Sequence, residues 1–91
     1  MDAIDLRYKE AILSHRIEFY KQKLVDWTNT YNVSMKMKGD FVLVDDILAA
    51  ASYHQQAQNA KTRITKITKQ LATWECQLNT VKAELSFAPK C

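Results

Sequence analysis

The chain has 91 residues, 47% of them hydrophobic and 25% charged, with one Gly, one Pro and a net charge of +3. This balance excludes intrinsic disorder, and the scarcity of Gly and Pro excludes an all-β fold with many turns. We expect one domain over residues 1–91. A domain of this size buries a modest share of its surface, so self-association is a natural means of stabilisation.

The cysteines and the apolar stretches bear on where the protein works. Cys76 and Cys91 have neither Cys-x-x-Cys spacing nor a neighbouring His, which argues against a disulfide scaffold or a zinc site. The chain begins with an acidic segment and not with a signal peptide. Its most apolar stretch, residues 41–51, contains Asp45 and Asp46 and is too short to span a bilayer. We therefore expect a soluble, cytoplasmic protein with no membrane partner.

The first helical signal is a row of large apolar residues in which the spacing alternates between four and three. This is the a/d pattern of a coiled coil, and it predicts a helix over about residues 3–31. Asp2 and Asp5 suit its N-terminus, where carboxylates meet the positive end of the helix dipole. The row comprises Leu13, Ile17, Tyr20, Leu24, Trp27 and Tyr31, and Leu6 and Ala3 extend it toward the N-terminus.

The connector, over residues 32–45, allows two interpretations. Residues 35–38 alternate between Met and Lys, Gly39 can form a turn, and residues 41–44 are all apolar. These features predict either a small β-hairpin or an extended loop that precedes the second helix. In both cases we expect the chain to fold back near Gly39.

The second helical signal predicts a helix over about residues 46–86 and a tail over residues 87–91, where Pro89 cannot continue a helix. Upstream, Ile47, Ala50 and His54 extend the apolar row with one slip of phase. Downstream the spacing alternates between three and four without interruption. That part of the row comprises Ala57, Ala60, Ile64, Ile67, Leu71, Trp74, Leu78, Val81 and Leu85.

Together these signals predict an all-α, antiparallel, coiled-coil-like two-helix hairpin. A fold-back near Gly39 places Tyr20 opposite Ala57, so a large residue meets a small one as close packing requires. In this register the second helix extends beyond the first by about three turns. We expect its uncovered apolar stripe to bind a partner helix or a second copy, which completes a bundle. The predicted partner-binding residues are Trp74, Leu78, Val81, Leu85 and Phe87.

Motifs for catalysis are absent from the sequence: it has no phosphate loop, nucleophile elbow or metal-ligand motif. We therefore expect no catalytic, cofactor or metal site, no cofactor and no small-molecule substrate. The predicted function is that of a non-enzymatic, homodimeric interaction protein, namely a chaperone, adaptor or assembly factor. The alternative is a nucleic-acid-associated regulator that uses the basic turns Lys61–Lys69. The scatter of these charges around the helix disfavours nucleic acid.

The order of helix, connector and helix, with Gly39 followed by apolar residues 41–44, is similar to that of a β-type prefoldin subunit. In that family a hairpin joins two long helices. The resemblance fits a role as a chaperone or assembly factor.

Overall fold

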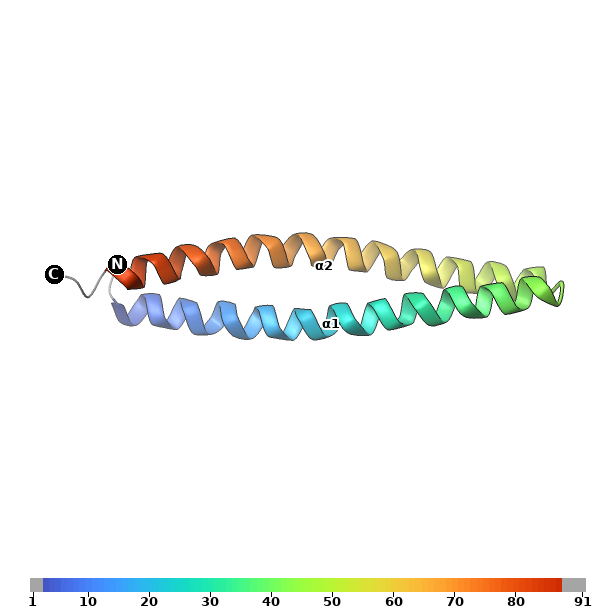
Figure 1. Ribbon diagram of the computed structural model, residues 1–91, viewed down its shortest axis with the longest axis horizontal. Coiled ribbons are helices and arrows are strands. Elements are labelled where there is room, and N and C mark those ends of the chain that lie inside the picture. The colour runs from blue at the N-terminus through green and yellow to red at the C-terminus, as the bar shows by residue number, and fades with distance from the viewer. Residues whose placement is uncertain (1–2, 88–91) are drawn as a thin grey trace. The chain divides into compact units, whose positions relative to one another are not determined.

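The computed structural model describes residues 3–87. Two α-helices of 41 residues each, α1 (Ala3–Leu43) and α2 (Ile47–Phe87), are joined by a short turn over residues 44–46 (Figure 1). The described chain forms two compact units. Unit 1 holds residues 3–22 and 69–87, and unit 2 holds Lys23–Thr68. In each unit a stretch of α1 packs antiparallel to a stretch of α2, which confirms the predicted all-α hairpin.

The rows of the predicted coiled coil make the contact between the helices. We call these two rows the seam. In α1 the spacing of four and three runs from Leu6 to Phe41, and in α2 the spacing of three and four runs from Ala50 to Leu85. Every residue at these positions is buried or half-buried. Tyr53, and not His54, continues the α2 row, so the predicted slip of phase does not occur.

The first helix is longer than the sequence predicts. α1 continues through the predicted connector to Leu43, so the prediction that it ends near residue 31 is wrong. The seam spacing continues through this segment at Ser34, Lys38 and Phe41. The packing of these residues against α2 outweighs the preference for a strand that the alternation of Met and Lys predicts. Because the whole of residues 32–43 is helical, neither the β-hairpin nor the extended loop expected there forms.

The turn between the helices is built by backbone hydrogen bonds. Asp45 adopts a left-handed conformation with φ of 61°. Its N–H donates to the carbonyl of Val42 at 3.1 Å, and the N–H of Asp46 donates to the carbonyl of Phe41 at 2.9 Å. These two bonds form a Schellman motif, which ends α1. The Asp46 carboxylate then accepts the N–H of Ala49 at 3.1 Å and caps the start of α2.

Gly39 takes no part in this turn. Its φ is not positive, it lies exposed within α1, and a Cβ atom added to it meets nothing within 4 Å. The chain therefore folds back six residues later than predicted, at Asp45.

The later turn changes the pairing across the seam in unit 1. Tyr20, predicted to lie opposite Ala57, contacts Trp74 with 4.9 Å between ring centroids. The partner of Tyr20 thus lies 17 residues, nearly two and a half heptads, beyond the predicted one. Because Ala57 and Trp74 both belong to the seam row of α2, the same residues still face inward. The buried cluster of this unit comprises Leu6, Leu13 and Val81, with Trp74, Leu78 and Leu85 packed against it.

Small residues from α2 dominate the buried part of unit 2. Ala57 and Ala60 have no exposed surface, and Ala50 is 5% exposed. A side chain as short as alanine is fully covered only where the opposing helix lies close to the backbone. Between Ala50 and Ala57 the row carries Tyr53, on which Phe41 of α1 stacks with 5.6 Å between ring centroids and an interplanar angle of 8°.

Candidate protein-binding surfaces

The predicted partner-binding stripe packs inside the hairpin of unit 1. Val81 is only 8% exposed, and Trp74, Leu78 and Leu85 are half-buried against α1. The expectation that α2 outruns α1 was wrong, because the two helices are equally long. The Phe87 side chain and residues 88–91 of the predicted tail lie outside the described part. Partner binding by these residues stays a prediction, but their observed neighbour is α1.

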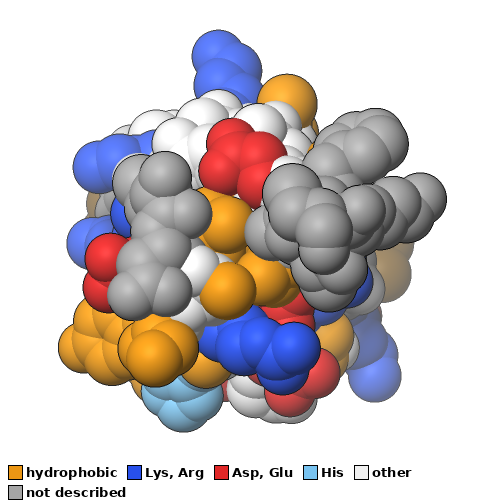
Figure 2. All heavy atoms as spheres, turned by 90° about the vertical axis from the view of Figure 1, so that its left-hand side faces the viewer, with side chains coloured by type: hydrophobic (Ala, Val, Ile, Leu, Met, Phe, Trp, Pro, Cys, Tyr) orange, Lys and Arg blue, Asp and Glu red, His pale blue; other side chains and the backbone are white. Residues whose placement is uncertain are grey.

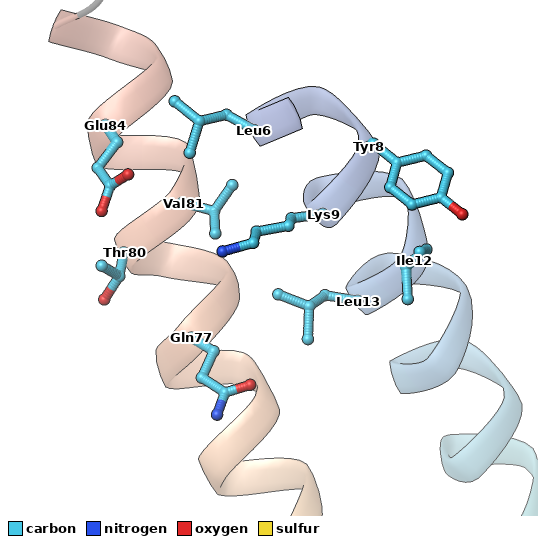
Figure 3. Close-up of a pocket in the computed structure, with 9 residues that line it drawn as sticks. All are labelled: Leu6, Tyr8, Lys9, Ile12, Leu13, Gln77, Thr80, Val81 and Glu84. Atoms are coloured by element: carbon cyan, nitrogen blue, oxygen red, sulfur yellow. The ribbon is translucent and has the colours of Figure 1, made fainter. Parts of the chain in front are cut away.

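A groove remains beside this packing in unit 1, with a volume of about 660 Å³. In Figure 3, Leu6 and Leu13 point from α1 toward α2, Val81 points back toward α1, and Tyr8 points away from α2. Of the predicted stripe, Val81 lines this groove. The other lining residues are Lys9, Ile12, Gln77, Thr80 and Glu84.

A second apolar row lies on α1 in unit 1. It consists of Ile4, Tyr8, Ile12 and Phe19, which we call the outer stripe; their exposed fractions are 73%, 68%, 38% and 51%. At about 100° per residue these side chains lie on a face of α1 turned away from the seam, and Tyr8 and Ile12 also border the groove beside the seam. Figure 2, which views the end where α1 begins and α2 ends, shows hydrophobic side chains at the surface among charged ones. In this unit α1 thus carries an exposed apolar row in addition to the seam.

Aromatic contacts hold one end of the outer stripe in place. The rings of Phe19 and Tyr20 meet edge to face, with 5.3 Å between centroids, and Tyr20 in turn contacts Trp74 in the seam. The guanidinium of Arg16 lies 5.4 Å from the centroid of Trp74, a cation–π arrangement. Phe19 is therefore an exposed side chain with a fixed orientation, as suits a contact surface.

The most exposed apolar side chains surround the turn in unit 2. Leu43 is 85% exposed and Leu48 is 87% exposed, and both adjoin the Schellman motif. The sequence points to this region as its most apolar stretch, but a predicted strand or loop gave no reason to expect exposure. We call this group of five side chains the turn patch: Val42, Leu43, Val44, Ile47 and Leu48.

The two helices differ in how much apolar surface they present. Large exposed hydrophobic side chains occur along α1 in both units. In α2 they are restricted to Ile47 and Leu48, within the described residues up to Ser86. The outward face of α2 carries many threonines, and the hydroxyls of several, such as Thr65 and Thr73, donate to carbonyls of the preceding turn. The candidate binding surfaces thus belong to α1 and the turn.

The basic turns of α2 are exposed, and one of their members is engaged within unit 2. The guanidinium of Arg63 lies 4.9 Å from the centroid of the Trp27 ring. Arg63 and Lys66 line a groove together with polar side chains such as Asn59 and Thr62. Lys69 belongs to unit 1. Nucleic-acid binding by the basic turns Lys61–Lys69 stays a prediction from the sequence.

Over residues 3–87, no group of three or more His, Cys, Asp or Glu side chains could hold a metal ion. Over the same residues, neither helix has the length and apolar character needed to cross a membrane. Comparisons with protein-family models, with curated proteins and with solved structures give no match for this chain.

Proposed function

We propose that the protein is a non-enzymatic interaction module of the chaperone, adaptor or assembly-factor class, which binds a partner helix through the turn patch. The observation that carries the proposal is the exposure of this patch, above all of Leu43 and Leu48 at 85% and 87%. Turns at a protein surface are usually polar, whereas an exposed apolar patch typically marks a binding site. The five large apolar side chains at this turn therefore favour a role in binding.

The patch has enough apolar surface for a useful affinity. A large apolar side chain gains about 1.5–3 kcal/mol when it becomes fully buried. A dissociation constant of about 1 μM corresponds to a net binding free energy of about 8 kcal/mol. This is the free energy that remains after the entropic and desolvation costs of association have been subtracted. Five such side chains on a turn fixed by hydrogen bonds and an N-cap can supply this free energy.

The charges around the patch favour a basic partner. Residues 40–48 include Asp40, Asp45 and Asp46 and no basic residue. Lys38, one helical turn before Val42, is engaged by a 3.0 Å hydrogen bond to Nδ1 of His54. These carboxylates would repel an anionic lipid surface and attract Lys or Arg at the border of an apolar helix face. We therefore propose an amphipathic basic helix of another protein as the ligand of the turn patch.

Site-specific photo-crosslinking in extracts of the source cells tests this proposal. A photoreactive residue at Ile47, which is 62% exposed, should form an adduct with one defined protein. The double variant Leu43→Asp, Leu48→Asp should abolish the adduct while the helical content persists. A photoreactive residue at the exposed Gln58, on α2 of the same unit, is the matched control and should give none.

Two results would contradict the proposal. One is an equal set of adducts from Ile47 and Gln58, or adducts that survive both Asp substitutions. The other is binding to vesicles that contain phosphatidylserine in place of a protein adduct, which would assign the turn patch to a membrane.

A further inference from the structure

We propose that the outer stripe of α1 binds the outer stripe of a second copy, with the two α1 helices antiparallel around a two-fold axis near Ala11 and Ile12. This surface is separate from the turn patch, so the two proposals can fail independently. The outer stripe is a row of large apolar side chains of unit 1 that are exposed in the hairpin.

The shape of the stripe suits an antiparallel copy of itself. Tyr8, Ile12 and Phe19 line a shallow groove along α1 of about 540 Å³, to which Ala11 and His15 also contribute. In an antiparallel pair centred between residues 11 and 12, Ile12 of one copy faces Ala11 of the other. Tyr8 faces His15, and Ile4 faces Phe19. Each larger side chain thus meets a smaller one, whereas a parallel pair would place Tyr8 on Tyr8.

The charges that border the stripe also match in this arrangement. Arg7 and Glu18 lie along one border, and Asp5 and Arg16 lie along the other, at about 100° per residue. In an antiparallel two-fold pair, each border of the stripe lies beside the same border of the second copy, which runs in the opposite direction. Arg7 therefore approaches Glu18 of the second copy, and Asp5 approaches Arg16. Arg7, Glu18 and Asp5 belong to exposed residues, whereas the Arg16 guanidinium packs on Trp74 within its own chain. The pair of Arg7 with Glu18 therefore carries the charge match.

Sedimentation of the full chain tests the proposal first. The wild type should be dimeric, and the double variant Tyr8→Glu, Ile12→Glu should remain helical while its dimer dissociation constant rises at least about 100-fold. Val25→Glu is the matched control, because Val25 is an apolar residue of α1 that is 52% exposed and lies off the stripe. It should stay dimeric.

Charge reversal and disulfide trapping test the orientation. Arg7→Glu and Glu18→Arg should each weaken the dimer, and the two together should restore it. In a background with Cys76→Ser and Cys91→Ser, Ala11→Cys should form a disulfide-linked dimer because it lies near the two-fold axis. Ile4→Cys should not, because its equivalent lies about 22 Å away along the helix.

A wild type that is monomeric at about 100 μM, well above the micromolar dissociation constants typical of weak dimers, would overturn the proposal. A dimer that survives the Tyr8 and Ile12 substitutions, or an Ile4→Cys disulfide between copies, would do the same. None of these results would affect crosslinking from Ile47, which tests the turn patch alone.

Discussion

Units 1 and 2 use the same heptad spacing with side chains of different size. In unit 1 the buried cluster is built from leucines and a valine on both helices, such as Leu13 and Val81. In unit 2 half of the α2 seam positions are alanines, and two of these, Ala57 and Ala60, are fully covered. The spacing thus decides which face is inside, while residue size decides how closely the helices meet.

The surfaces of the two units also differ in the side chains that line their grooves. The groove beside the seam of unit 1 is lined by apolar residues such as Tyr8 and Ile12, whereas the groove in unit 2 is lined by polar residues such as Thr30 and Gln56. Apolar surface in unit 2 is instead strongest at the turn. Self-association through unit 1 and partner binding through the turn would therefore use distinct parts of the chain.

The largest expected effect comes from removing bulk in unit 1. Leu13→Ala should lower the free energy of unfolding by about 2–4 kcal/mol, because it leaves a cavity in a seam of large side chains. Urea unfolding at one fixed protein concentration measures this, since self-association would also raise stability. Gln77→Ala, at an exposed position of α2, should change the value by less than about 0.5 kcal/mol. Equal losses at both positions would contradict the buried cluster.

Adding bulk in unit 2 is the converse test. Ala57→Leu should lower the free energy of unfolding by about 1–3 kcal/mol, because a fully covered alanine leaves no room for three more carbons. Gln58→Leu adds an apolar side chain at the neighbouring exposed position and should be close to neutral. If Ala57→Leu were instead stabilising, the helices of unit 2 would lie farther apart than the covered alanines indicate.

The smallest effects distinguish the observed turn from the predicted one. Gly39→Ala should raise the free energy of unfolding by about 0.5–1 kcal/mol, because glycine has low helix propensity and nothing blocks a Cβ atom there. Asp45→Gly should raise it by up to about 1 kcal/mol by relieving a left-handed residue that carries a side chain. Thermal unfolding detects both. A loss of stability in Gly39→Ala would place the turn back at residue 39.

The seam could be predicted from the sequence because its spacing depends only on helix geometry. The register could not, because a heptad row offers equivalent pairings every seven residues and the turn alone selects among them. Gly39 is the strongest local turn signal, yet the turn forms at Asp45, where the backbone and Asp46 supply the hydrogen bonds. Because the predicted register was wrong, the C-terminal stripe of the second helix was expected to be uncovered, and the exposure of the turn patch was not expected. The outer stripe was overlooked because its spacing of four, four and seven is weaker than that of the seam.

Disulfide trapping within one chain tests the central claim, that the turn at residues 44–46 sets the register and covers the C-terminal stripe. In a background with Cys76→Ser and Cys91→Ser, the pair Leu13→Cys and Val81→Cys should oxidise rapidly to a monomeric crosslinked species, because both side chains belong to one buried cluster. The pair Leu13→Cys and Ile64→Cys, which tests the register of an earlier fold-back, should stay reduced. Crosslinking of the second pair and not the first would contradict the observed register and the surfaces that depend on it.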